Sequence, residues 1–352
     1  MQNTSFQIRG ERLTLVSIAV CVRDGVDWID GCMDSLVAQT HSPIEIILVD
    51  DGSSDGGRDA VEKWSKHELV STISQDKLGL SAGRMAALEQ SKGEWFAITD
   101  IDVRPEADWI QRMLESSKSG EEENVVAVTG RTVFGRADDV ISRIRSIEIE
   151  SKYRSRPRRT NLANGPCSMF KRDNLLAIGG FDPSWYHAED MEVSLKLIQD
   201  GGIIVYTPNA VVNHIPETGL KRFLGKRKRD ARAHVRIHRR YKILRSGHDF
   251  IGSSWVVLWM IPLLTLLGVA IYQYATTLFS YESVNLDSMY YSLTREVLLI
   301  AAAPLYWLIS FIRSDLPKKG IYSKIVLFAW SAALWQGIIL GYIDALLGKN
   351  GH

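Results

Sequence analysis

The sequence predicts an α/β domain with a mostly parallel sheet, followed by a basic amphipathic helix and three transmembrane helices. Three observations lead to this prediction. Continuous apolar, β-branched runs alternate with helical patterns over about 130 residues of the N-terminal part, as in a sheet whose strands are buried on both faces. A segment dense in lysine and arginine follows, and three uncharged runs fill the last hundred residues. The expected boundaries are residues 1–216, 217–250 and 251–352.

The first part is expected to bind a ligand at the carboxyl ends of its strands. Its apolar runs have the length and composition of buried strands, and the segments between them have helical spacing. No GxGxxG follows the first strand and no GxxxxGK[ST] occurs anywhere, so the usual dinucleotide and P-loop sites lose support. Strands are expected at residues 13–22, 44–49, 94–99 and 125–130, and helices at 28–39 and 81–91.

Acidic side chains follow two of these strands. Asp50 and Asp51 end one strand, while Asp100 and Asp102 follow another. In open parallel sheets ligands bind at this edge, although acids also serve as turn residues and helix caps. Two carboxylates leaving one turn suit a hard divalent cation such as Mg²⁺ or Mn²⁺.

A third acidic group lies further along, in "GGFDPSWYHAED". Glu189 and Asp190 begin a helical pattern there, where acids can also simply complement the helix dipole. A carboxylate in this position could accept a proton from an attacking hydroxyl, as a general base does.

Six segments occur in the order seen in one enzyme family. They are "VSIAVCVRD", "SLVAQTHSPIEIILVDDGSSDGG", "GLSAGRMAAL", "KGEWFAITDIDVRP", "GGFDPSWYHAEDMEVSLKLIQDGG" and "YTPNAVVNH". From Leu15 to His214 the chain resembles a membrane-attached family 2 glycosyltransferase, which implies a GT-A fold and an inverting transfer. Cys21, Arg23–Asp24 and Met85 depart from the residues common in the family.

The resemblance implies a role for each acidic group. Asp51, with the backbone around Cys21, matches the part that reads the base of a nucleotide-sugar, and Arg84 lies near that nucleotide. Asp100 and Asp102 match the DxD pair, in which Asp102 is the expected metal ligand and Asp100 contacts the metal or the nucleotide-sugar.

The same resemblance makes Asp190 the catalytic base, with Glu189 as the neighbouring candidate. His214, at the end of the last matching segment, could contact phosphate or metal, although a core or surface histidine is the more common case at such a position. The implied cofactor is Mg²⁺ or Mn²⁺.

The basic segment from Lys221 to Arg245 carries twelve Lys and Arg against one acid. Its apolar residues form one helical stripe, which predicts a helix lying on membrane lipids. A nucleic-acid helix would have similar charge, but the apolar runs that follow make nucleic acid an unlikely partner. "RDAR" resembles a family motif in which Arg229 and Arg232 would hold the diphosphate or the acceptor.

The three apolar runs are Trp255–Tyr272, Val297–Ile312 and Ile325–Ile343. Their lengths suit membrane spans, with buried core helices as the alternative. The loop between the first two is acidic and the loop between the last two is basic, which places the N-terminal domain in the cytoplasm and the C-terminus outside. The N-terminus lacks the apolar core of a signal peptide, and the three cysteines fit a reducing compartment.

The expected function is transfer of one sugar from a nucleoside-diphosphate-sugar to a lipid-linked acceptor at the cell membrane, by a multi-pass protein. A processive polysaccharide synthase is the nearest alternative, although the QxxRW pattern is absent. A membrane-anchored, receiver-like signalling module or an inactive scaffold would also place acids at strand ends. Neither alternative explains "HAED" together with the basic helix.

Overall fold

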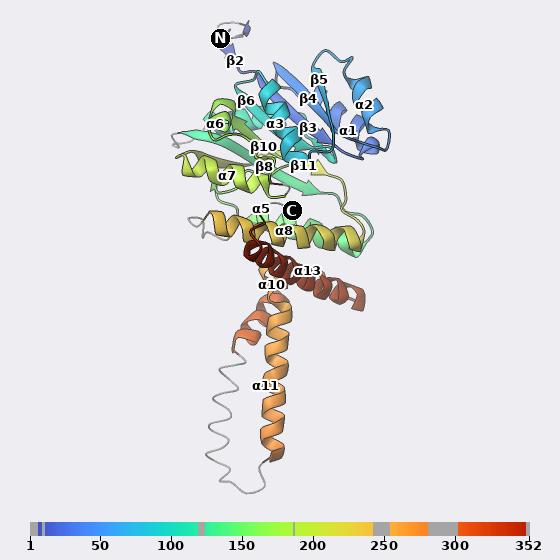
Figure 1. The fold of residues 1–352 in the computed structure, drawn as a ribbon, viewed down its shortest axis with the longest axis vertical. Helices are drawn as coiled ribbons and strands as arrows, with labels where there is room; N and C mark the ends of the chain where they lie inside the picture. Colours follow the sequence, from blue (N-terminus) through green and yellow to red (C-terminus); the bar gives the residue numbers. More distant parts are fainter. Residues whose placement is uncertain are drawn as a thin grey trace.

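The computed structural model describes residues 6–8, 11–118, 124–185, 187–241, 254–280 and 302–349. A nine-stranded sheet forms the centre of the N-terminal part (Figure 1). Its strands are β3 (Val16–Val22), β4 (Ile44–Asp51), β5 (Val70–Gln75), β6 (Trp95–Asp100), β7 (Val103–Pro105), β8 (Val125–Phe134), β9 (Arg159–Thr160), β10 (Ser168–Lys171) and β11 (Ile203–His214). A separate two-stranded sheet pairs β1 (Phe6–Ile8) with β2 (Glu11–Leu13).

The large sheet has the order β5-β4-β3-β6-β10-β8-β11-β7, with β9 also paired to β11. The first four strands in this order are parallel, as predicted. β10 is antiparallel to both β6 and β8, and β7 and β9 are antiparallel to β11, while β8 and β11 are parallel. The sheet is therefore mixed, with a parallel half that carries the first two acidic strand ends.

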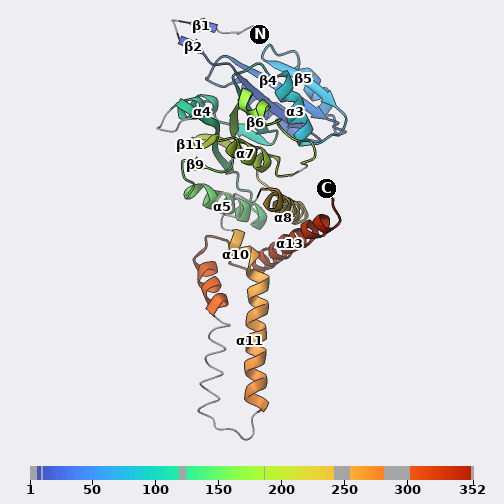
Figure 2. The same cartoon turned by 60° about the vertical axis from the view of Figure 1, so that its left-hand side comes forward.

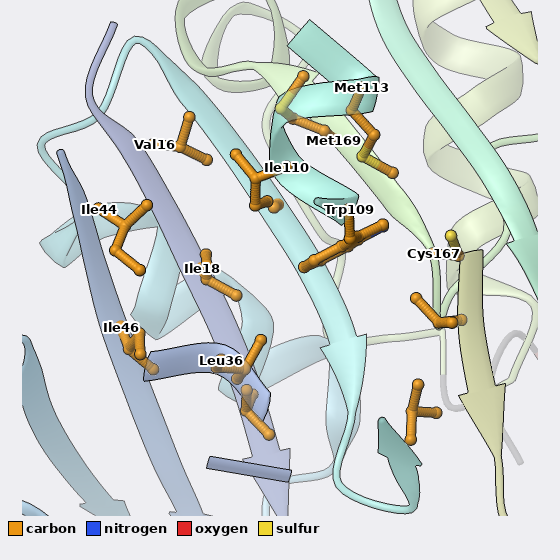
Figure 3. Packing of buried hydrophobic residues seen from close by; sticks show 14 of the residues in the cluster. Val16, Ile18, Leu36, Ile44, Ile46, Trp109, Ile110, Met113, Cys167 and Met169 are labelled. Atoms are coloured by element: carbon orange, nitrogen blue, oxygen red, sulfur yellow. The ribbon is translucent and has the colours of Figure 1, made fainter. Parts of the chain in front are cut away.

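Helices cover both faces of the sheet. On one face, buried side chains of α1 (Val26–Val37) and α4 (Trp109–Lys118) pack against the strands, with Leu36 and Trp109 fully buried (Figure 3). On the other face lie α3 (Leu80–Gln90), α6 (Arg172–Ala177) and α7 (Glu189–Gln199). The remaining helices of this part are α2 (Gly57–Trp64) and α5 (Val140–Arg154). Burial on both faces explains why the strands read as continuous apolar runs.

The C-terminal third is arranged in layers beneath the sheet. The basic helix α8 (Leu220–Arg240) lies between the sheet domain and α13 (Ile321–Leu346), and α11 (Met260–Ser280) projects away from the domain (Figures 1 and 2). The short helix α10 (Ser254–Leu258) precedes α11, and residues 302–313 are also helical.

Three transmembrane helices are not confirmed by this arrangement. Within the described ranges, α13 alone has the length and apolar composition to cross a bilayer, and the apolar helix Met260–Thr276 is shorter. The first predicted span is divided between α10 and α11, because the helix is interrupted at Trp259. The second predicted span lies partly outside the described residues.

Candidate functional site

The strand ends come together as predicted. Cys21 of β3 is paired in register with Val49 of β4 on one side and with Asp100 of β6 on the other. Asp51 lies one residue beyond the part of β4 that pairs with β3, and it is paired with Gln75 of β5 on the other side. The acidic ends of β4 and β6 therefore flank the end of β3 on one edge of the sheet.

Asp50 and Asp51 have different surroundings. Asp50 is fully buried, and its carboxylate accepts hydrogen bonds from Ser53 N at 3.0 Å and from Arg58 Nε at 3.1 Å. Asp51 accepts bonds from the loop ahead of α3, with Leu78 N at 2.8 Å and Gly79 N at 3.0 Å. Gly79 has a φ of +96°, a conformation that favours glycine. Asp50 thus holds its own turn, whereas Asp51 fixes the approach to α3.

Arg84 of α3 joins two of the predicted acidic groups. Its guanidinium is buried, with Nη1 donating to Glu189 Oε1 at 2.7 Å and Nη2 donating to Asp100 Oδ1 at 3.0 Å. Nη2 also lies 3.4 Å from the carbonyl oxygen of Gly165. The DxD segment and the start of α7, almost ninety residues apart in sequence, are therefore connected through one cation.

Glu189 and Asp190 point to different partners. Glu189 is buried against Arg84, whereas Asp190 is half-buried and accepts bonds from Gly165 N at 3.0 Å and Met191 N at 2.8 Å. Ala188, just before them, has a φ of +61°, a left-handed conformation that is strained for a residue with a Cβ. Asp190 is thus the more accessible of the two carboxylates.

Burial raises the pKa of both carboxyl groups. The pKa of Glu189 rises to about 7, because burial outweighs the attraction of Arg84 and the neighbouring Asp190 raises it further. The pKa of Asp190 is raised by burial as well, against the opposing effects of Arg84 and the hydrogen bonds from Gly165 and Met191. A carboxylate with a raised pKa is a stronger base, which suits acceptance of a proton from a hydroxyl.

Asp102 and His214 form a second pair. His214 Nε2 lies 3.3 Å from Asp102 Oδ1, and its Nδ1 lies 2.7 Å from the carbonyl oxygen of Ile215. The imidazole also stacks on Phe134, with 4.1 Å between ring centroids. Burial raises the pKa of Asp102, while the charge on His214 opposes this shift. A hydrogen bond from Nδ1 to the carbonyl oxygen would leave Nε2 facing the carboxylate.

This donor set fits a divalent cation that is completed by its substrate. Ligands bound to one ion at 2.0–2.2 Å lie roughly 3 Å apart, which matches the separation of His214 and Asp102. In the part of the chain that the structure describes, no group of three or more His, Cys, Asp or Glu could hold an ion by itself. Mg²⁺ is often held by one or two carboxylates plus substrate phosphates, so a site of this kind would need a diphosphate to complete it.

The roles expected for Arg229 and Arg232 of the basic helix stay predictions. Arg229 is exposed, and Arg232 forms a bidentate pair with Asp344 of α13, with Nη2 2.7 Å from Oδ1. Burial raises the pKa of Asp102, and the charges of Lys226 and Arg222, about one and two turns before Arg229 in α8, oppose this rise. Arg222 and Lys226 are four residues apart, so they lie on one face of the helix. This spacing is the feature of the sequence from which their shared position could have been predicted.

Cys21 is a neutral neighbour of the site. Burial raises the pKa of its thiol to about 12. A Cβ on Gly83 would lie 2.9 Å from its Sγ, so α3 packs directly against the end of β3. The place of Cys21 beside the nucleotide-reading part remains a prediction.

Comparison with known proteins supports the family suggested by the six motifs. The model of glycosyl transferase family 2 matches residues 17–179, and that of glycosyl transferase family group 2 matches residues 120–341, more than half of the chain. The chain belongs to glycosyltransferase family 2.

Several members of family 2 are similar in sequence. The glycosyltransferase EpsH of Bacillus subtilis is 37% identical over 112 residues, 32% of each chain. The glucosyl-dolichyl phosphate glucuronosyltransferase of Haloferax volcanii is 24% identical and covers 56% of this chain and 68% of its own. The poly-β-1,6-N-acetyl-D-glucosamine synthase of Staphylococcus aureus is 24% identical over 61% of this chain and 54% of its own. The alignment spans about a third of the length of the curated relatives with higher identity.

A solved structure shares the fold of this glycosyltransferase. The mannosyltransferase PcManGT of Pyrobaculum calidifontis, in complex with GDP-Man and Mn²⁺, aligns with a TM-score of 0.53 at 17% identity. The alignment covers 96% of this chain and 88% of that chain. The predicted GT-A fold is therefore supported, with the mixed sheet described above.

Proposed function

We propose that this glycosyltransferase transfers one sugar from a nucleoside-diphosphate-sugar to a hydroxyl or phosphate of a lipid-linked acceptor, with inversion at the anomeric carbon. The observation that carries the proposal is the contact of Arg84 with both Asp100 and Glu189. This contact brings the DxD pair and the candidate base to one edge of the sheet. Asp51 lies at the end of β4, on the other side of β3 from the DxD strand β6, and is the proposed contact for the nucleotide base.

Each acidic group has a separate task in this mechanism. Asp190 accepts the proton of the acceptor hydroxyl while that oxygen attacks the anomeric carbon. The bond between that carbon and the diphosphate breaks in the same step, so no enzyme nucleophile is needed. Glu189 and Arg84 hold the start of α7 in position.

Asp102, with Asp100 and His214, would hold Mg²⁺ or Mn²⁺ at the diphosphate. Such an ion supplies Lewis-acid stabilisation of the negative charge on the leaving group. The structural neighbour PcManGT is solved in complex with GDP-Man and Mn²⁺, which supports divalent metal use.

A membrane acceptor is supported by the C-terminal third and by one relative. α13 and α11 expose large apolar side chains, including Ile271 at 61% and Ile339 at 56%, and such surfaces mark contact with lipid or protein. The Haloferax relative is named for a dolichyl phosphate glycan. The charge of the loops favours a cytoplasmic catalytic domain.

The test is incubation of membranes containing the full chain with a panel of radiolabelled nucleotide-sugars, followed by lipid extraction. One donor should label the lipid fraction, and Asp190→Asn membranes should not. Label confined to free sugar with every donor would contradict the proposal.

A processive synthase is the second candidate, because a poly-N-acetylglucosamine synthase is among the relatives. Product length separates the two: one added sugar per acceptor supports single transfer, and a ladder supports a polymer.

A further inference from the structure

α13 is docked along α8 by close backbone contact. A Cβ on Gly337 would lie 2.3 Å from the carbonyl oxygen of Lys228, and one on Gly341 would lie 3.0 Å from the carbonyl oxygen of Arg232. One turn further on, Asp344 pairs with Arg232 in a bidentate geometry. The two glycines thus allow an approach that any larger side chain would prevent.

The contact between the two helices is long. At its beginning, the rings of Trp330 and Phe223 meet edge to face with 5.3 Å between centroids. At its end is the Arg232–Asp344 pair. Trp330 and Asp344 are fourteen positions apart, which corresponds to about 21 Å along the helix at 1.5 Å per residue. α13 therefore follows α8 for most of the thickness of a bilayer core, which is about 30 Å.

α8 cannot accompany a membrane-crossing helix over that distance. The sequence of α8 contains ten Lys and Arg and one acid, and α8 is also held to the sheet domain by polar contacts. Arg227 reaches Glu148 of α5, and Tyr241, which follows α8, bonds Glu192 of α7 at 2.8 Å. Charged side chains in the hydrocarbon region are rare and costly. Because α8 stays outside the bilayer core, the helix packed along it must stay outside as well.

Two tryptophans hold the segments on either side of residue 320 against α10, at the end of α11 that lies next to the sheet domain. Trp307 Nε1 donates to the carbonyl oxygen of Val256 at 2.7 Å, and Trp335 Nε1 donates to that of Leu258 at 2.7 Å. Both carbonyls belong to α10, immediately before α11 leaves the domain (Figures 1 and 2). The chain is therefore back at the domain end of α11 by Trp307, and it is still there at Trp335.

The outward face of α13 is largely apolar, with Lys324 and Gln336 as exposed polar side chains along the helix. Its exposed large side chains recur at helical spacing, and Lys318 and Lys319 precede the helix. This pattern is typical of a helix that lies in the interface with its basic flank near lipid headgroups. The exposed residues are Ile321, Tyr322, Ile325, Phe328, Ile339, Tyr342, Ile343 and Leu346.

We propose that α13 lies in the plane of the membrane surface, with this outward face in the boundary between headgroups and acyl chains, and does not cross the bilayer. The occupant of the face is lipid, because the face is continuous with α11 through the Trp335 contact and Trp259–Trp335 ring packing at 6.1 Å. The C-terminus then lies on the same side of the membrane as the catalytic domain, the opposite of what loop charge alone predicted. This inference concerns attachment and is independent of which sugar is transferred.

Depth measurements on the full chain in vesicles of phosphatidylethanolamine and phosphatidylglycerol test it. Spin labels are placed on the outward face with Ile325→Cys, Ile339→Cys and Ile343→Cys, and their accessibility to oxygen and to a water-soluble nickel chelate gives the depth. An in-plane helix puts all three at one shallow depth. A crossing helix would separate the first and the last by about 27 Å.

Matched controls come from other parts of the chain. Leu264→Cys and Ile271→Cys on α11 should differ in depth by about 10 Å if that helix enters the bilayer, and Lys63→Cys on α2 should report bulk water. The parent chain corrects for Cys21, Cys32 and Cys167. A depth gradient along α13 would overturn the proposal. So would protection from both reagents accompanied by a dimeric mass in detergent, since a second copy would then cover this face.

Discussion

Replacing Asp190 with asparagine separates proton acceptance from shape at the proposed base. The change keeps the volume of the side chain and removes its ability to accept the acceptor's proton. Turnover should therefore fall by the 10²–10⁴-fold typical of a lost general base, about 2.7–5.4 kcal/mol at 1.36 kcal/mol per tenfold.

The cost to folding is smaller and can be derived from two hydrogen bonds. The carboxylate accepts from Gly165 N at 3.0 Å and from Met191 N at 2.8 Å. An asparagine carbonyl oxygen can replace one acceptor atom but not both, which leaves one backbone N–H without its bond at about 1–3 kcal/mol. A domain of ordinary stability, about 5–15 kcal/mol, stays folded after such a loss.

The assay measures nucleoside diphosphate release with acceptor present, beside the donor dissociation constant by calorimetry. The expected result is a collapsed kcat with a nearly unchanged donor constant, because the nucleotide and metal contacts are assigned to Asp51 and Asp102. Glu189→Gln is the control and should retain more activity, since Glu189 is turned inward to Arg84. Near-normal turnover in Asp190→Asn with loss in Glu189→Gln would refute the assignment within the pair.

Three further outcomes are expected. Chelation by EDTA should abolish transfer and Mn²⁺ should restore it, and Asp102→Asn should weaken Mn²⁺ binding followed by electron paramagnetic resonance with donor diphosphate present; unaltered Mn²⁺ binding would contradict the metal role. Because the pKa of Glu189 is raised from 4.5 to about 7, its contribution favours the folded state below pH 4.5 and is lost as pH rises to 7. The melting temperature of the wild type should therefore fall relative to that of Glu189→Gln between pH 4.5 and 7. If the two melting temperatures changed in parallel with pH, the raised pKa of Glu189 would be contradicted. Arg232→Gln should lower the melting temperature because it removes the ion pair with Asp344, whereas Arg229→Gln, at an exposed position, should not. Equal effects of the two substitutions would argue against the Arg232–Asp344 pair.

The parallel half of the sheet could be predicted from the sequence because strands that are buried on both faces consist of continuous apolar runs. β3, β4 and β6 lie close to the expected residue ranges. The antiparallel insertion of β10 between β6 and β8 was not predicted, because a four-residue strand has no periodicity of its own and its direction depends on distant partners. The three predicted membrane spans are not confirmed, and length and hydropathy do not reveal that Gly337 and Gly341 face a charged helix.

At the site, sequence order predicted which acids gather but not what holds them. The register of β3 with β4 and β6 places the acids as expected. The contact of Arg84 with Glu189 could not be predicted, since it joins positions 105 residues apart. Similarly, no local motif indicated the pairing of Arg232 with Asp344, and the role expected for Arg232 in holding a ligand stays a prediction.

The docking of α13 on α8 has a consequence for synthesis of the chain. α8 ends at Arg240 and α13 ends at Leu346, so the partner of α8 leaves the ribosome about a hundred residues later. At 5–20 residues per second that delay is roughly 5–20 s. During this interval the buried stripe of α8, including Phe223, Ala231 and Val235, has no covering helix. The nascent catalytic domain therefore exposes an apolar, aggregation-prone surface until translation ends. A fragment truncated after Tyr241 should need a chaperone or detergent to remain in solution.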